Sequence, residues 1–383
     1  MSKKTPLLMI PGPTNMPDRV MNAMQRPVIN HKSEEFRELH RSVIEGTKYA
    51  FQTQNDVFVL TCSGTGGIEC AASNIVSPGD KVVVPVSGVF SQRLKENFER
   101  FGATVIEIPI EWRKAATPSQ IREVVEREEN VKAIGIVYNE TSTGVTMRGL
   151  DEVGKIAEEH GALLVVDAIS ILGGDRLPVD EWKVDVCVTG SQKCIACPPG
   201  VVMVSVSERA WEIIAKSRRG SYYFDLMKCK EFQEKLETPY TPAIPLFYAL
   251  DEALKMLKEE GLENRIKRHK VCADAFYDAT QTLGLTFFAD PQVRSNTVIA
   301  VNIPQGVEDK AWRDLMLKYG VAIGGGLGKL KGSIIRIGSM GIISKVEVNE
   351  TVSVLGKSLA ELWKPVDVDA AIAAAEKVFA SSS

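Results

Sequence analysis

The most specific segment of the chain is Val184-Asp185-Val186-Cys187-Val188, followed directly by Thr189-Gly190-Ser191-Gln192-Lys193. Its first half is a short, largely apolar run, as expected for a strand that is covered on both faces. Its second half brings a lysine just past the end of that strand. In an open α/β sheet, this carboxyl edge is where ligands bind. The stretch therefore predicts a mainly parallel sheet with a ligand site at its edge.

Similar apolar runs recur along the chain and alternate with helical patterns, such as the one over residues 149–160. The runs cover residues 57–60, 81–84, 132–138, 162–166 and 201–206. This alternation predicts an α/β fold with right-handed crossovers. Beyond residue 262 a basic helical stretch precedes two more strand-like runs, at 297–301 and 334–337. We therefore expect an N-terminal segment (1–15), a large ligand-binding domain (16–262) and a small α+β C-terminal domain (263–383).

Composition excludes several classes of protein. Apolar residues make up 44% of the chain and charged residues 25%, with a net charge of −3 spread along the sequence. Such a balance gives no electrostatic reason to expect nucleic acid or an anionic membrane as a partner. No apolar run approaches the roughly 18 residues of a membrane helix, and the N-terminal apolar stretch is too short for a signal peptide. We expect a cytoplasmic protein.

The cysteines give no framework for disulfides or a metal. There are seven of them, an odd number without regular spacing, and the chain has only four histidines. Cys194-Ile195-Ala196-Cys197 has the spacing of half a zinc site or of a redox pair. Because no second pair completes a site, we expect ordinary buried cysteines and no metal.

Lys193 and Asp167 are the candidate catalytic residues. A lysine near a core is costly, and one reason for its place is imine formation with an aldehyde cofactor, which desolvation helps by lowering the amine pKa. Asp167 directly follows the apolar run 163–166 and so reaches the same edge. A carboxylate there can keep the ring nitrogen of a pyridoxal cofactor protonated. The alternatives are an exposed loop lysine and an aspartate that caps a helix.

Residues 61–69, Thr-Cys-Ser-Gly-Thr-Gly-Gly-Ile-Glu, form a Gly-rich turn that opens a helix. Such a turn offers backbone N–H groups, hydroxyls and the positive end of a helix to a phosphate. The turn lacks the Gly-Lys-Ser/Thr ending of a nucleotide P-loop and the spacing of the dinucleotide fingerprint. Together with Lys193 and Asp167, it favours a phosphorylated cofactor.

These motifs resemble the class V aminotransferases of fold type I, specifically the alanine–glyoxylate and serine–pyruvate aminotransferase family. The resemblance runs from about Pro11 to Trp363. Its other anchors are residues 11–15 (Pro-Gly-Pro-Thr-Asn), 87–93 (Ser-Gly-Val-Phe-Ser-Gln-Arg), 139–144 (Asn-Glu-Thr-Ser-Thr-Gly), 166–169 (Val-Asp-Ala-Ile), 198–200 (Pro-Pro-Gly), 240–245 (Tyr-Thr-Pro-Ala-Ile-Pro) and 335–338 (Ile-Arg-Ile-Gly).

The resemblance implies a pyridoxal 5'-phosphate enzyme and a role for each matched residue. Lys193 would form the imine and Asp167 would pair with the ring nitrogen. The phosphate would be held by Ser63, Gly64, Thr65 and Gln192, and by Tyr240 and Thr241 of a segment that reaches the neighbouring subunit of a homodimer. The ring would lie between Phe90 and Ile169, with Thr141 near its hydroxyl.

Arg336 is the residue that we expect to bind the substrate carboxylate, with Gly12 also lining the substrate site. A planar guanidinium offers a carboxylate two parallel hydrogen bonds, which lysine cannot. Alternation along residues 334–337 puts Arg336 opposite its apolar neighbours, and the alternative is a surface arginine on an edge strand.

The resemblance implies a ping-pong transamination from alanine or serine to glyoxylate or pyruvate. Phosphoserine and aminoethylphosphonate aminotransferases remain alternatives, because fold does not fix function. A cysteine desulfurase is disfavoured, because no cysteine follows Cys272 and Phe90 stands where desulfurases typically have histidine. The alternative from another class is a non-catalytic, phosphate-binding α/β scaffold.

Overall fold

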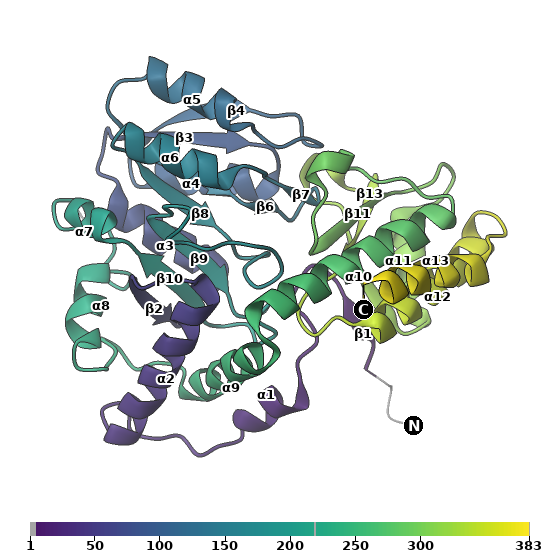
Figure 1. Cartoon of the computed structure of the whole chain (residues 1–383), viewed down its shortest axis with the longest axis horizontal. Helices are drawn as coiled ribbons and strands as arrows, with labels where there is room; N and C mark the ends of the chain where they lie inside the picture. The colour runs from purple at the N-terminus through teal and green to yellow at the C-terminus, as the bar shows by residue number, and fades with distance from the viewer. Residues whose placement is uncertain (1–4, 218–219, 383) are drawn as a thin grey trace.

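The computed structural model describes residues 5–217 and 220–382, which form a larger and a smaller unit, each built on its own sheet (Figure 1). The larger sheet has seven strands in the order β2-β10-β9-β8-β5-β3-β4. These are β2 (Asp56–Leu60), β3 (Lys81–Val86), β4 (Thr104–Pro109), β5 (Val131–Val137), β8 (Leu163–Asp167), β9 (Val186–Gly190) and β10 (Val202–Val206). Only β10 runs antiparallel to its neighbours, so the predicted mainly parallel α/β fold is confirmed.

The strands of the larger sheet are apolar along their whole length because both faces are covered. Every residue of β8, β9 and β10 is buried. In β8, Leu164 and Val166 join one hydrophobic cluster, whereas Leu163 and Val165 join the other. Successive strand residues point to opposite faces, and a core on each side therefore selects a continuous apolar run.

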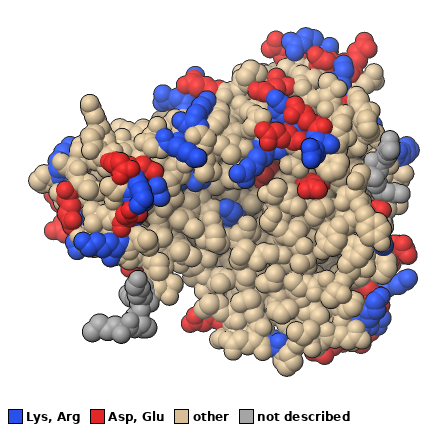
Figure 2. Space-filling view, turned by 180° about the vertical axis from the view of Figure 1, so that it is seen from behind, with Lys and Arg blue, Asp and Glu red and all other residues tan. Residues whose placement is uncertain are grey.

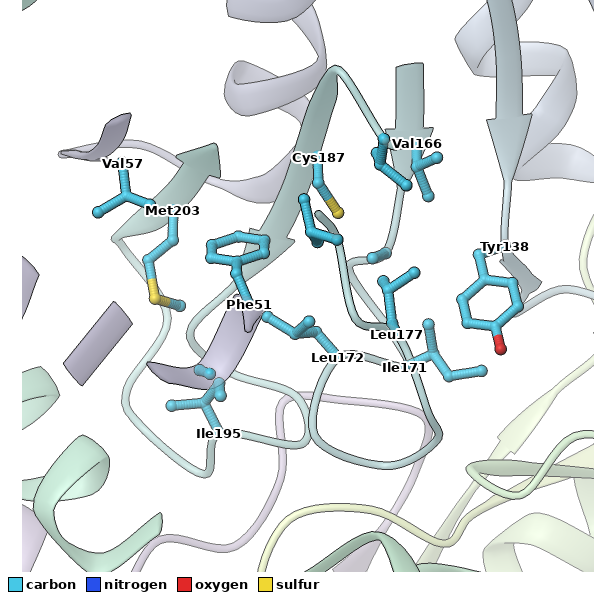
Figure 3. Close-up of a cluster of buried hydrophobic side chains, with 14 of the residues drawn as sticks. Phe51, Val57, Tyr138, Val166, Ile171, Leu172, Leu177, Cys187, Ile195 and Met203 are labelled. Carbon is cyan, nitrogen blue, oxygen red and sulfur yellow. The ribbon is translucent and has the colours of Figure 1, made fainter. Parts of the chain in front are cut away.

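Helices of the larger unit supply those two cores. They are α1 (Asp18–Ala23), α2 (Glu34–Phe51), α3 (Gly64–Ile75), α4 (Val89–Arg100), α5 (Pro118–Arg127), α6 (Leu150–Glu159), α7 (Glu208–Ile214), α8 (Leu226–Gln233) and α9 (Ile244–Glu260). Buried residues of α2, α5, α6 and α9 share one cluster, and those of α3, α4, α7 and α8 share the other. Figure 3 shows part of the first cluster, with Phe51 of α2 beside Met203 of β10.

The smaller unit contains a four-stranded sheet in the order β1-β12-β13-β11. Its strands are β1 (Leu7–Met9), β11 (Val298–Asn302), β12 (Val321–Gly325) and β13 (Ile334–Gly338). Its helices are α10 (Leu262–Thr282), α11 (Asp309–Lys318), α12 (Lys345–Leu362) and α13 (Val368–Ser381), with 3-10 turns η1 (Pro291–Val293) and η2 (Gly328–Leu330). Figure 1 shows α10 leading from the end of α9 into this unit.

The N-terminal segment is part of the smaller sheet. Leu7 and Met9 of β1 pair in parallel with Val321 and Ile323 of β12. The segment therefore packs against residues more than 300 positions later in the chain. The proposed domain boundary at residue 262 stays a prediction, although α10 begins there.

Cysteines and surface charge agree with an ordinary globular protein. All seven cysteines are free, and all but Cys62 are buried. Figure 2 shows Lys and Arg lying among Asp and Glu on one face, beside a broad area that carries no charge. Among the described residues, no helix has the length and apolar character that a membrane span requires.

Candidate active site

Lys193 and Asp167 line one cavity at the carboxyl edge of the larger sheet. Asp167 is the last residue of β8, and the neighbouring strand β9 ends at Gly190, three residues before Lys193. The two strands are parallel, so their carboxyl ends lie at the same edge of the sheet. The cavity, of about 680 Å³ including its mouth, lies within the roughly 300–1,000 Å³ that is usual for ligand sites.

Most of the predicted cofactor contacts meet in this cavity. Its lining includes nine of them: Ser63, Gly64, Thr65, Phe90, Thr141, Asp167, Ile169, Gln192 and Lys193. They come from the start of α3, the start of α4, and the ends of β5, β8 and β9. Chain segments that are far apart in the sequence thus supply one set of polar and aromatic groups.

The Lys193 side chain is partly buried beside the N-terminal segment. Its Nζ donates a hydrogen bond to the carbonyl oxygen of Pro11. A Cβ at Gly12 would stand only 2.6 Å from the same Nζ, so this approach requires glycine. Burial is the main cause that lowers the pKa of Lys193 to about 8, and the charge of Arg336 lowers it further. A larger share of the amine is therefore neutral and nucleophilic near neutral pH.

Asp167 is a buried carboxyl group, 7% exposed, at the end of β8. Burial raises its pKa to about 7, against the opposing effects of a hydrogen bond from the Ile169 backbone and the charge of Lys193. The Ile169 N–H donates to Oδ1 over 2.9 Å. A cationic ring nitrogen in the cavity would favour the charged carboxylate, which fits the pyridinium of pyridoxal phosphate.

The start of α3 provides an anion site that the helix itself does not fill. Ser63 is the N-cap residue, but its side chain makes no capping hydrogen bond, and the first N–H groups of a helix lack partners within the helix. Gln192 lines the same cavity, and its side-chain NH2 group is a donor that can bond a phosphate oxygen. A Cβ at Gly64 would come within 2.7 Å of Cδ1 of Ile169, so a larger residue here would displace the Ile169 side chain. These groups fit a phosphate.

Phe90 and Thr141 are held by their backbone and side-chain contacts. The Phe90 N–H donates to both carboxylate oxygens of Glu140, at 3.2 and 3.1 Å, and the Arg93 guanidinium lies 5.0 Å from the centre of the Phe90 ring. The Thr141 hydroxyl donates to Ser170 over 2.7 Å. These contacts fix the start of α4, and with it the Phe90 ring, at the wall of the cavity.

Arg336 lies behind Thr141 and does not line the cavity itself. It is 8% exposed on β13, an interior strand of the smaller sheet, so it is not an arginine on an edge strand. Its cross-strand neighbours, Ala300 and Gly324, are small. Nε donates to the carbonyl oxygen of Gly325 over 2.8 Å. Burial lowers its pKa to about 10.

Tyr240 and Thr241 lie apart from the other predicted contacts. They line a second cavity, of about 460 Å³ with its mouth, together with Tyr223, Thr238 and Pro239. The rings of Tyr223 and Tyr240 are stacked, with 5.1 Å between their centres. Within one chain, the structure does not bring these two residues to Lys193.

Sequence reasoning missed Glu140. This carboxylate is 1% exposed and accepts hydrogen bonds from the N–H groups of Phe90 and Ser91 and from the hydroxyls of Ser91 and Ser142. It thereby holds the start of α4 against the loop after β5. A Cβ at Gly88 would stand 2.3 Å from its Cδ. The available signal was an acidic residue three positions past the end of β5, within the 139–144 motif.

No group of three or more His, Cys, Asp or Glu side chains that could hold a metal occurs among the described residues. That the functioning protein uses no metal cofactor stays a prediction.

Comparison with known proteins gives a consistent family. Residues 7–330 match the model of the aminotransferase class-V family. The chain is 42% identical, over 93% of both chains, to an uncharacterised aminotransferase of Methanocaldococcus jannaschii. It is 37% identical to the serine–glyoxylate aminotransferase of Methylorubrum extorquens, over 96% of this chain and 94% of the relative. The solved structure of ureidoglycine–glyoxylate aminotransferase from Bacillus subtilis superposes with a TM-score of 0.94, at 30% identity over 99% of each chain.

Proposed function

Because the chain belongs to the class-V aminotransferase family, we propose that it is a pyridoxal-phosphate-dependent transaminase that moves the amino group of alanine or serine to glyoxylate or pyruvate. The observation that carries the proposal is the cavity in which Lys193, Asp167 and the start of α3 meet. Amine, carboxylate and anion site are the three partners that this cofactor needs.

Pyridoxal phosphate, when bound, supplies a carbonyl that condenses with amines and a protonated ring that accepts electrons from the substrate Cα. Lys193 would hold it through the buried amine. Once the amino donor has displaced it from the cofactor, this amine would take the proton from the substrate Cα as general base. It would then give that proton to the former carbonyl carbon of the cofactor as general acid. A pKa of about 8 suits that exchange at neutral pH.

Each other residue would bind or orient. Asp167 would keep the ring nitrogen protonated, and Ser63, Gly64, Thr65 and Gln192 would hold the phosphate. Phe90 and Ile169 would flank the ring, with Thr141 near its hydroxyl.

Arg336 would bind the donor carboxylate, with Gly12 lining the same site. Its two hydrogen bonds to Gly325 and Thr141 use two of the five N–H donors of a guanidinium. No described residue accepts a hydrogen bond from Nη2, which leaves that edge for a carboxylate.

The acceptor and donor follow from the names of the relatives. Glyoxylate is named for both the Methylorubrum and the Bacillus proteins, and serine for the first, which supports glyoxylate as the acceptor here. The phosphoserine and aminoethylphosphonate alternatives are not favoured. A cysteine desulfurase would need a mobile cysteine, whereas Cys272 is fully buried in the core of the smaller unit.

A homodimer is part of the proposal, with Tyr240 and Thr241 completing the phosphate site of the partner subunit. Their distance from the Lys193 cavity within one chain supports this arrangement. So do the exposed rings of Tyr222 and Tyr223, at 79% and 42% exposed, because exposed aromatic side chains are enriched at interfaces. Activity in the cytoplasm is expected from the sequence alone.

Purification tests the proposal directly. The protein should be yellow, or become yellow with added pyridoxal phosphate, and borohydride should bleach the colour and fix the cofactor on the peptide that contains Lys193. Lys193→Ala should fold but lose transamination and the bleachable colour. A panel of donors and acceptors would then identify the substrates. A wild-type protein that stays colourless after addition of cofactor would refute the proposal.

A further inference from the structure

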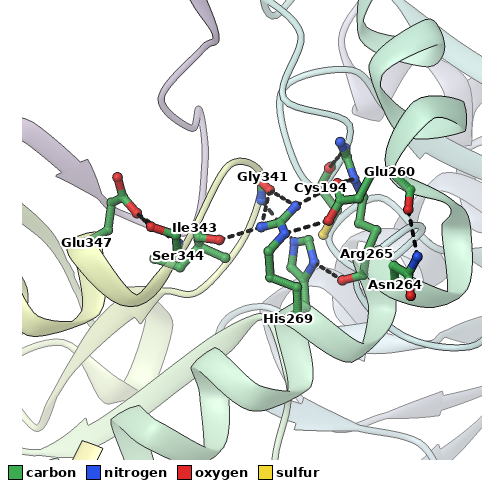
Figure 4. A network of polar contacts seen from close by, with 10 residues as sticks. Cys194, Glu260, Asn264, Arg265, His269, Gly341, Ile343, Ser344 and Glu347 are labelled. Atoms are coloured by element: carbon green, nitrogen blue, oxygen red, sulfur yellow. Dashed lines mark hydrogen bonds and ion pairs between the residues drawn. The ribbon is translucent and has the colours of Figure 1, made fainter. Parts of the chain in front are cut away.

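A cluster of four side chains at the junction of α9 and α10 lies outside the cavity and contacts two loops of the site (Figure 4). We call Glu260, Arg265, Arg268 and His269 the α10 latch. Arg265 is 3% exposed and His269 is fully buried. Buried polar side chains are costly unless they are paired, so the partners of the latch show what it holds.

One side of the latch holds the loop that carries Lys193. The Nη1 of Arg265 donates to the carbonyl oxygen of Cys194, the next residue, over 3.2 Å. The carbonyl oxygen of Lys193 itself accepts from the hydroxyl of Thr14 over 3.3 Å. The backbone on the C-terminal side of Lys193 is thus fixed at two successive carbonyl groups.

The other side of the latch holds the loop that follows β13, the strand of Arg336. Arg268 donates to the carbonyl oxygens of Gly341, at 3.2 Å, and of Ile343. The Gly341 N–H donates to Nε2 of His269 over 3.1 Å. Both polar groups of Gly341 are therefore bound by α10.

His269 binds Gly341 in one fixed tautomer. Its Nδ1 lies 2.8 Å from the carbonyl oxygen of Arg265, which can only accept, so Nδ1 carries the proton. Nε2 must then accept from Gly341. Burial, together with the charge of Arg268, lowers the pKa of His269 to about 3, and the ring stays neutral at working pH.

Glu260, the last residue of α9, ties the two arginines together. Its carboxylate accepts from Nε of Arg265 over 2.7 Å and from Nε of Arg268 over 2.6 Å. The two loops also share a small hydrophobic cluster, which Cys194 and Met340 form with Val298. Polar contacts through Glu260 and the apolar cluster therefore both hold the Lys193 loop and the loop after β13 close together.

We propose that the α10 latch is a positioning device that sets the distance between the Lys193 amine and the Arg336 guanidinium. The inference rests on the roles proposed above for these two residues. Lys193 follows β9 of the larger sheet and Arg336 lies on β13 of the smaller one. Helix α10 packs with the smaller sheet while binding the loop that carries Lys193. None of the latch residues lines the cavity, so they act through the two loops.

Removal of the imidazole nitrogens tests the latch. His269→Leu deletes both hydrogen bonds, whereas His269→Gln can keep an acceptor for the Gly341 N–H. His269→Leu should lower kcat/KM for the amino donor at least about tenfold, because misplacement by about 1 Å can cost a hundredfold. It should also slow imine formation when pyridoxal phosphate is added to the cofactor-free protein. His269→Gln should recover much of both losses. Arg268→Met, at a more exposed site, should act like His269→Leu if the latter folds poorly.

Phe276→Leu is the matched control, since Phe276 is buried on the same helix in the core of the smaller unit and has no place in the latch. It should lower Tm without changing kcat/KM or the rate of imine formation. If His269→Leu and Arg268→Met, compared below their Tm, behave like this control, the latch is merely structural and the inference is overturned. A wild-type protein that forms no imine at Lys193 would instead overturn the proposed function, and the role of the latch with it.

Discussion

Arg336 donates a hydrogen bond of 3.0 Å from Nη1 to the carbonyl oxygen of Thr141, a residue 195 positions earlier in the chain. This bond crosses from the smaller sheet to the wall of the cavity, because Thr141 lines the cavity and Arg336 lies behind it. This hydrogen bond holds one edge of the Arg336 guanidinium against the backbone of Thr141. The remaining donors of the guanidinium are those that the proposed binding of a substrate carboxylate would use.

Replacement of Arg336 by lysine should therefore weaken binding of the amino donor and also slow the reaction. A point charge cannot bond Thr141 and also offer two parallel donors. We expect the KM of the amino donor to rise roughly 10- to 100-fold, since a hydrogen bond to a charged group contributes about 1.5–3 kcal/mol. A lower kcat should accompany it. Single-turnover kinetics would measure both, with amine donors that lack a carboxylate as the control. Equal losses on both kinds of donor would mean that Arg336 is structural.

Asp167→Asn should keep the cofactor but react roughly 10- to 100-fold more slowly, because a neutral amide forfeits the charge-assisted bond to the ring nitrogen, which contributes about 1.5–3 kcal/mol. Pre-steady-state absorbance would measure the reaction rate of the variant against that of the wild type. Asp185→Asn is the control: Asp185 is also a buried aspartate of the larger unit, but it bonds Leu164 and Ser207 outside the cavity. It should lower stability and leave the rate unchanged. A wild-type rate in Asp167→Asn would demote Asp167 to a turn residue.

The pH dependence of imine formation should report the buried amine. Only the neutral amine attacks a carbonyl, and burial lowers the pKa of Lys193 from 10.5 to about 8. The rate at which cofactor-free protein reacts with pyridoxal phosphate should therefore rise with pH and level off above about pH 8. Stopped-flow absorbance would measure it, with Lys193→Ala as the blank. A rate that still climbs at pH 10 would show an ordinary, exposed lysine.

Gly12→Ala should damage the site through one methyl group. The added Cβ would stand 2.6 Å from Lys193 Nζ and 2.5 Å from its Cδ. Gly79→Ala is a close control, because its φ of +91° matches the +87° of Gly12, yet nothing lies within 4 Å of its Cβ. Both variants should lose about 1–2 kcal/mol of stability from the left-handed backbone. Only Gly12→Ala should also slow imine formation, and equal behaviour would exclude contact with Lys193.

Mixed dimers would test whether Tyr240 acts across the subunit boundary. Sedimentation should first find a dimer at assay concentration; an active monomer would refute this. Tyr240→Phe should weaken binding of pyridoxal phosphate. A hybrid of one Lys193→Ala chain with one Tyr240→Phe chain would contain one complete site if Tyr240 acts in trans, and cofactor affinity at that site should then be restored. No restoration would place Tyr240 with its own subunit.

Local patterns were enough to predict the α/β fold and to bring Lys193, Asp167 and the Gly-rich turn to one edge of the sheet, whereas the family resemblance supplied the roles of most other candidate site residues. The apolar run that ends at Asp167 identified a buried strand, because two covered faces leave no place for polar residues along it. The lysine past the next strand and the Gly-rich turn then had to meet at the same edge, since parallel strands and the helices that follow them share one polarity.

Contacts between distant segments of the chain are visible only in the folded protein. The sequence does not indicate that Leu7–Met9 joins β12, that Arg336 reaches Thr141, or that His269 binds Gly341. In each case a backbone or side-chain group is satisfied by a partner more than 70 positions away, and no short-range pattern encodes such a partner. Burial then sets the chemistry: the sequence supplies the Lys193 amine, and only its desolvation in the folded chain lowers its pKa.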